Sequence, residues 1–146
     1  MWAPDLPRGI RNNNPGNIRL TKARWHGQKK IQSDISFIEF ENATYGLRAL
    51  MKVLLTYHRK YHLDTVQSII NRWAPPHENA TDHYAGHVAM RLNVKRTDIV
   101  NVLSKEVLTG FAAAITIHEN GWPPKSYPKN WYEDEIYKCA YRMAIS

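Results

Sequence analysis

Hydrophobic residues recur at helical spacing along most of the chain after residue 42. Spacings of three and four residues place side chains on one face of a helix. The pattern predicts helices over residues 43–61, 65–74, about 80–93, 105–119 and about 130–144. The chain is therefore expected to be mostly α-helical.

Capping residues support several of these boundaries. Asn42, Asp64 and Ser104 each precede a segment of helical periodicity, and such side chains accept hydrogen bonds from the first turn of a helix. Gly121 is followed closely by two prolines, an arrangement typical of a helix end.

The first third of the chain has a different composition. Residues 1–33 are rich in Asn, Gly, Pro, Arg and Lys, with a turn signal at residues 14–16. Residues 34–40, DISFIEF, alternate apolar and polar positions, with Ile35, Phe37 and Glu39 on the alternating positions, which is typical of a strand in a small hairpin. We expect a small β lobe beside the helices, within a single domain covering residues 1–146.

The predicted helix that ends in "AAAITIHENG" finishes on a carboxylate. On a helix, Phe111 and Ile115 lie on the same face as Glu119. Apolar surroundings and the negative end of a helix dipole both raise the pKa of a carboxyl group. An acid that stays protonated near neutral pH can protonate the leaving oxygen of a glycosidic bond. Glu119 is therefore a candidate general acid; the alternative is a polar residue that only ends a helix.

Four motifs, "RGIRNNNPGNIR", "FIEFENATYGLRAL", "IINRWAPPHENATDHY" and "HENG", together resemble a group of phage and prophage virion proteins assigned to the lysozyme-like superfamily. The resemblance extends over most of the chain. It implies a lysozyme-like fold and a hydrolase or lytic transglycosylase that cleaves peptidoglycan (murein). The bond would be the β-1,4 linkage between N-acetylmuramic acid and N-acetylglucosamine.

A second resemblance concerns the order of the motifs. Cell-wall glucosaminidases and lytic transglycosylases carry a helix ending in an acidic residue, followed by segments similar to "NNNPGNIR" and "FIEFENATYGLRALMKVLLTYH". In this chain the acidic helix comes last. We therefore expect a circularly permuted lysozyme-like domain. The resemblance assigns the general acid to Glu119, although Asn120 stands where these enzymes usually have Ser.

A glycosidase usually needs a second carboxylate. Asp34, at the start of the expected strand, is the first candidate and Glu78 is its rival, while Glu39 and Glu41 lie nearby in the sequence. The alternative for Glu78 is an acid that interacts with a helix dipole. If no second carboxylate acts, a lytic transglycosylase is favoured, because one residue then serves as acid and base and the muramoyl 6-hydroxyl replaces water.

Glycan clefts combine flat aromatic faces with amide hydrogen bonds, and six residues offer these groups. The candidates for substrate binding are Asn13, Asn14, Asn17, Trp73, Tyr84 and Trp122. Turn formation is the alternative for the asparagines, and a place in the core is the alternative for Trp73.

The net charge of +7 favours an anionic partner. Because the basic residues are spread along the chain, nucleic acid is not favoured, and peptidoglycan strands and other virion proteins are the expected partners. No organic cofactor or metal is implied. His58 with His62, and His83 with His87, have spacings that could bind Zn²⁺, but neither pair belongs to an HExxH motif and no cysteine joins them.

The sequence also bears on location. No apolar run reaches the roughly 20 residues of a membrane span, and "MWAPDLPRGIR" has no hydrophobic signal core. We expect a protein of the phage virion, or of the bacterial cytoplasm before delivery, that acts at the periplasmic cell wall. The alternative from another class is a non-catalytic phage structural or peptidoglycan-binding protein, which would hold the same glycan without cutting it.

Overall fold

The structure is a computed structural model that describes residues 6–76 and 80–146. This described part is mostly helical. Its helices are α1 (Arg8–Arg11), α2 (Ala43–Tyr61), α3 (Val66–Trp73), α4 (Thr81–Leu92), α5 (Lys105–Asn120) and α6 (Asp134–Ile145). The five longer helices correspond to the five segments expected from hydrophobic periodicity.

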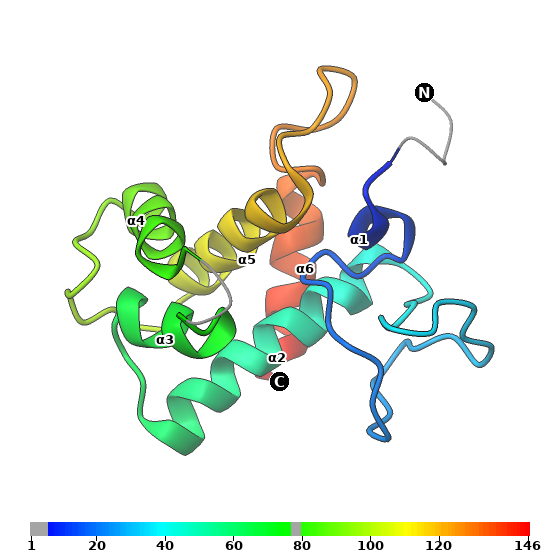
Figure 1. Ribbon diagram of the computed structural model, residues 1–146, viewed down its shortest axis with the longest axis horizontal. Helices are drawn as coiled ribbons and strands as arrows, with labels where there is room; N and C mark the ends of the chain where they lie inside the picture. The colour runs from blue at the N-terminus through cyan, green and yellow to red at the C-terminus, as the bar shows by residue number, and fades with distance from the viewer. Residues whose placement is uncertain (1–5, 77–79) are drawn as a thin grey trace.

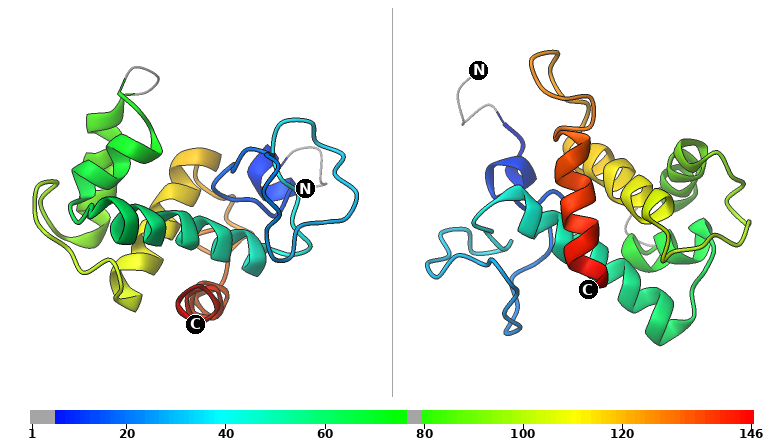
Figure 2. Two further views of the ribbon diagram at one scale, coloured as in Figure 1. Left: turned by 90° about the horizontal axis from the view of Figure 1, so that it is seen from below. Right: turned by 180° about the vertical axis from the view of Figure 1, so that it is seen from behind.

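Helices α2 and α5 cross the middle of the molecule (Figure 1). In the views of Figures 1 and 2, α3 and α4 lie on one side of this pair, and α1 with the loop of residues 12–42 lies on the other side. Helix α6 packs along α2 and also contacts α5. The end of α5 is therefore placed between the helical half and the loop-rich half.

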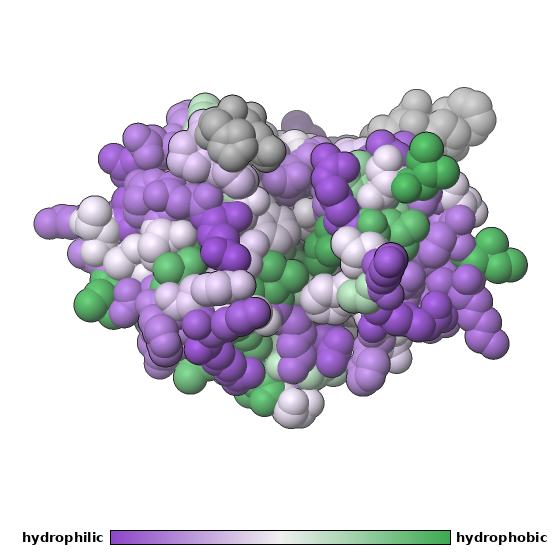
Figure 3. All heavy atoms as spheres, turned by 60° about the horizontal axis from the view of Figure 1, so that its bottom comes forward, coloured by the Kyte–Doolittle hydropathy of each residue, from purple (hydrophilic) through white to green (hydrophobic). Residues whose placement is uncertain are grey.

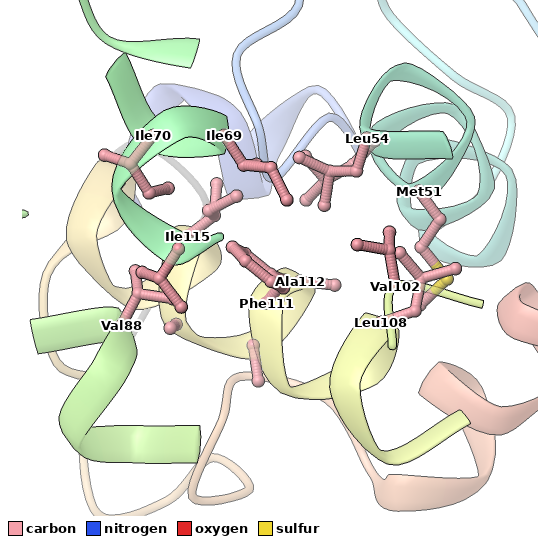
Figure 4. Packing of buried hydrophobic residues seen from close by; sticks show 14 of the residues in the cluster. Met51, Leu54, Ile69, Ile70, Val88, Val102, Leu108, Phe111, Ala112 and Ile115 are labelled. Carbon is pink, nitrogen blue, oxygen red and sulfur yellow. The ribbon is translucent and has the colours of Figure 1, made fainter. Parts of the chain in front are cut away.

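The main core lies where α2, α3, α4 and α5 meet. Figure 4 shows side chains from these four helices pointing toward one another, among them Leu54 on α2, Ile69 on α3, Val88 on α4 and Ile115 on α5. All four side chains are fully buried. This packing fixes the direction of α5 and hence the position of its C-terminal end.

The expected β lobe is not a β-sheet. In the described part of this lobe, pairing is limited to isolated bridges, Arg19 with Phe37 and Gln28 with Phe40. Side chains replace the missing ladder, since the amide of Asn14 donates to two backbone carbonyls of the lobe. The expected apolar positions of residues 34–40 are also wrong, because Ile35 is exposed and Ile38 and Phe40 fill a small separate core instead.

Three of the four expected helix boundaries are confirmed. Asn42 and Ser104 accept hydrogen bonds from the first turns of α2 and α5, and Gly121 follows the last residue of α5. The expectation for Asp64 is wrong, because Thr65 caps α3 through reciprocal bonds with the residue three positions on. The Thr65 hydroxyl, one position further on, accepts from the N–H of Ser68 in the first turn.

The surface is largely polar. Figure 3 shows a face on which hydrophilic side chains predominate and hydrophobic residues form small separate groups. No helix in the described part of the chain combines the length and hydrophobicity needed to cross a bilayer.

Candidate functional site

A cleft of about 470 Å³ opens beside the C-terminal end of α5. Residues from α2, α3, α5 and the loop of residues 12–42 line it. The described lining consists of Gly16, Asn17, Ile18, Arg19, Phe37, Val53, Tyr57, Trp73, Ala74 and Glu119. Glu119 is the one carboxylate of this lining, and Arg19 is the one cation.

Helix α5 carries Glu119 to the wall of the cleft. The helix is buried along most of its length, from Leu108 to Ile117, so its end is held firmly. Gly121 has a φ of 81°, a conformation that favours glycine, and the chain leaves the helix axis there. The carboxyl of the last turn therefore stays half-buried and in reach of the cleft.

Two hydrogen bonds orient the carboxyl of Glu119. The hydroxyl of Tyr84 donates to Oε2 at 3.2 Å, and Nδ2 of Asn17 donates to Oε1 at 3.4 Å. Nε1 of Trp73 in turn donates to the hydroxyl of Tyr84 at 3.1 Å. Three of the residues expected at the site thus form one hydrogen-bonded chain that ends on Glu119.

Burial raises the pKa of Glu119 above its ordinary value, and the hydrogen bonds from Asn17 and Tyr84 only partly oppose this. Burial also raises the pKa of Tyr84, and the charge of Glu119 raises it to a smaller extent. The Tyr84 hydroxyl therefore keeps its proton and remains a donor. The arrangement combines an acid of raised pKa with fixed donors around it. It can deliver a proton to a group bound in the cleft.

The loop-rich half is held directly against the acidic end of α5. Nδ2 of Asn120 donates to the carbonyl of Pro15 at 2.9 Å, and Asn17 adopts a left-handed φ of 50° that turns its side chain toward Glu119. Gly9 allows this close approach, since a Cβ there would lie 2.6 Å from Oδ1 of Asn120 and 2.9 Å from Oδ1 of Asn17.

Asn13 and Asn14 do not line the cleft. Asn14 is fully buried, where its side chain bonds to the backbone of Ile18 and Ile38. Asn13 donates to the carbonyl of Phe40 at 3.1 Å. Both side chains organise the loop, so the turn-forming alternative describes them better than substrate binding.

Asp34 does not line the cleft either. Its carboxylate accepts two hydrogen bonds of 2.6 Å from Arg8 and one of 2.9 Å from Asn12. The backbone N–H groups of Ser36 and Phe37 also donate to it. The bonds from Arg8, and then those from Asn12 and the backbone, hold the pKa of Asp34 far below its ordinary value. This position supports a structural role for Asp34, and its assignment as the second catalytic carboxylate stays a prediction from the sequence.

The rival carboxylate, Glu78, lies outside the described residues. It follows α3, whose last residues line the cleft, and its assignment stays a prediction from the sequence.

Trp122 lies in a separate hollow. It is 69% exposed and lines a space of about 280 Å³ together with His83, His87 and His118. The ring of His118 stacks on that of Tyr84 with the centroids 3.6 Å apart. Trp122 is not among the described residues that line the Glu119 cleft.

Among the lining residues that sequence reasoning missed are Arg19, Phe37 and Tyr57. Phe37 lay in the alternating segment and Tyr57 on the predicted helix, but nothing in the sequence distinguishes a cleft position from a core position. The guanidinium of Arg19 lies 5.1 Å from the centre of the Phe37 ring.

The histidine pairs do not make a metal site in the described part of the chain, where no group of three His, Cys, Asp or Glu residues is arranged to hold an ion. His62 adopts a left-handed conformation just after α2, so it does not share a helical face with His58. Nδ1 of His58 lies 2.9 Å from the carbonyl of Leu63 instead.

No family model matches the chain. Protein P5 of Pseudoalteromonas phage PM2 is 37% identical to it over 137 residues, which are 92% of this chain and 80% of that protein. Identity at this level over most of both chains shows common descent. The chain therefore belongs to the same family as Protein P5 of this phage.

Proposed function

We propose that this protein cleaves the glycan strands of peptidoglycan, with Glu119 as the general acid. The observation that carries the proposal is the position of Glu119. A half-buried carboxyl at the end of an apolar helix, with a raised pKa, faces a cleft lined by the aromatic side chains of Phe37, Tyr57 and Trp73. Aromatic faces suit sugar rings, and a neutral acid suits a glycosidic leaving group.

The proposed reaction breaks the β-1,4 bond from N-acetylmuramic acid to N-acetylglucosamine. Glu119 donates its proton to the glycosidic oxygen as the bond from this oxygen to C1 of the muramoyl unit breaks. The hydrogen bonds from Tyr84 and Asn17 stabilise the carboxylate that remains. Glu119 then takes a proton from the incoming hydroxyl group as that oxygen bonds to C1.

A lytic transglycosylase fits the described lining better than a two-carboxylate hydrolase. Glu119 is the one carboxylate among the described lining residues, and Asp34 is engaged by Arg8. In a transglycosylase the muramoyl 6-hydroxyl is the nucleophile, so the product is a 1,6-anhydro ring and no second carboxylate is required. A role for Glu78 would instead favour water as the nucleophile.

The contacts between α5 and the first loop support a permuted lysozyme-like domain. In the enzymes that the sequence resembles, the segment similar to "NNNPGNIR" follows the acidic helix along the chain. Here this segment precedes the helix by about a hundred residues, yet Asn17 and Pro15 bond to Glu119 and Asn120. The same neighbours in space with a different chain order are what a circular permutation would give.

The relationship to a phage protein supports a role in the phage particle, where the enzyme would open the cell wall locally during genome delivery. The net charge of +7 would favour adsorption to an anionic wall.

Digestion of purified peptidoglycan followed by mass spectrometry tests the proposal. We expect anhydro-muramoyl ends from the wild-type protein, and loss of at least about a hundredfold in rate for Glu119→Gln. Glu41→Gln, which removes an exposed carboxylate, is the matched control and should keep the activity. Reducing muramic ends would identify a hydrolase. Sacculi that bind the protein but stay intact would indicate the non-catalytic, peptidoglycan-binding alternative.

A further inference from the structure

Arg19 occupies an unusual position in the cleft. It lines the cleft with Glu119, it is exposed, and it forms no ion pair with a carboxylate in the described part of the chain. Its guanidinium lies 5.1 Å from the centre of the Phe37 ring. Arg8 also lies over this ring, at 4.7 Å, but its charge is neutralised by Asp34.

The backbone of Arg19 is held in place. Arg19 and Phe37 form an isolated bridge, and the neighbouring residues on each side are also bonded to the opposite segment. The N–H of Leu20 donates to the carbonyl of Ser36 at 2.9 Å, and the N–H of Ile38 donates to the carbonyl of Ile18 at 3.0 Å. A guanidinium on such a fixed support, stacked on an aromatic ring, loses little freedom when it binds an anion.

The charges of the cleft indicate what this cation would bind. Arg19 is the one cation of the described lining, and a planar guanidinium pairs with a carboxylate through two parallel hydrogen bonds. A chitin-type glycan is neutral, whereas a peptidoglycan strand carries carboxylates beside its sugar rings. Resting on the proposed function, we infer that Arg19 is a specificity residue that binds a carboxylate of the substrate and selects peptidoglycan over neutral glycans.

The carboxylate has two possible sources, the lactyl group of the muramoyl unit and the stem peptide. Three soluble tetrasaccharides distinguish them: a peptidoglycan fragment with stem peptides, the same fragment with the peptides removed by an amidase to free the lactyl carboxylate, and neutral chitotetraose. Their dissociation constants are measured by calorimetry on Glu119→Gln, to prevent turnover, with and without Arg19→Gln. Arg24→Gln is the matched control, because Arg24 is an exposed cation outside the cleft lining.

We expect at least one carboxylated fragment to bind about tenfold or more tightly than chitotetraose, the effect of one charge-assisted hydrogen-bonded pair. Arg19→Gln should abolish this preference and leave the affinity for chitotetraose within about twofold, while Arg24→Gln should keep the preference. Tight binding of the amidase-treated fragment alone would identify the lactyl group, and tight binding of the peptide-bearing fragment alone would identify the stem peptide.

Equal affinity for all three ligands, no binding of either carboxylated fragment, or a preference that survives Arg19→Gln would overturn the inference. These outcomes are distinct from failure of the proposed function, which is the absence of bond cleavage by the wild-type protein. A protein that prefers carboxylated glycans through Arg19 but never cleaves them would refute the enzymatic proposal and keep this one.

Discussion

Replacing Glu119 with Gln should stabilise the protein at neutral pH while it removes the proposed activity. The buried carboxyl has a folded-state pKa above its ordinary value of 4.5. The folded wild-type protein therefore binds more protons than the unfolded chain at any pH between these two pKa values. Its free energy of unfolding must fall as the pH rises through this range.

The size of the effect follows from the one proton involved. Between the two pKa values, the wild-type protein loses up to about 1.4 kcal/mol of stability per pH unit relative to the Glu119→Gln variant. For a chain of this size, that slope corresponds to about 3–6 °C of Tm per pH unit. Below pH 4.5 the protonated acid and the amide have nearly the same shape and charge, so the two proteins should differ little.

Thermal or urea unfolding of both proteins at a series of pH values from 4 to 9 measures the difference. We expect the stability gain of Glu119→Gln to grow with pH and to level off above the folded-state pKa of Glu119. Glu41→Gln, which removes an exposed carboxylate, should give no gain of this kind. A gain that is as large at pH 4 as at pH 8, or a variant that is less stable at pH 8, would refute the claim that Glu119 is kept neutral by burial.

Three further variants test other parts of the structure. Tyr84→Phe removes a hydrogen bond to the Glu119 carboxylate, so the pKa of Glu119 should rise and the alkaline limb of the pH–rate profile should move to higher pH; an unmoved limb would contradict the bond. Gly46→Ala should cost about 1–3 kcal/mol in urea unfolding because its Cβ would meet a backbone carbonyl, whereas Gly86→Ala, which has room, should gain about 0.5–1 kcal/mol. If both substitutions raised, or both lowered, the free energy of unfolding, this result would contradict the packing of α2 on the first loop. Asp34→Asn should lower the Tm above pH 4, where the paired carboxylate stabilises the fold, and should leave the pH–rate profile unchanged. Loss of the acid or alkaline limb of this profile would instead indicate a catalytic role for Asp34.

The helical half of the fold was predictable because its signals are local. Hydrophobic spacing identified α2 through α6, since a helix that packs by one face must repeat apolar residues every three or four positions. The caps at Asn42 and Ser104 were readable for the same reason, because a cap bonds to residues within its own first turn. Asp64 was misassigned where two adjacent residues could both serve.

The loop-rich half was less predictable because its contacts are not local. The alternation in residues 34–40 was wrongly assigned to a strand with Ile35 and Phe37 as its apolar positions, since Ile35 is exposed and the buried residues are Ile38 and Phe40. The backbone carbonyl of Ile38 is satisfied by the side chain of Asn14, which lies 24 positions away in the sequence. Hydrogen bonds of this kind produce no periodic pattern of residues in the sequence.

The sequence by itself determined that the chain is mostly α-helical and that an acidic residue, Glu119, ends an apolar helix. Only the tertiary structure decided which groups surround that acid. It brought Asn17, Trp73 and Tyr84 into one hydrogen-bonded chain on Glu119 and placed Arg19 in the cleft, while it assigned Asp34 to a structural ion pair. The physical reason is that burial and charge pairing depend on residues up to a hundred positions apart, which the order of the amino acids alone does not place side by side.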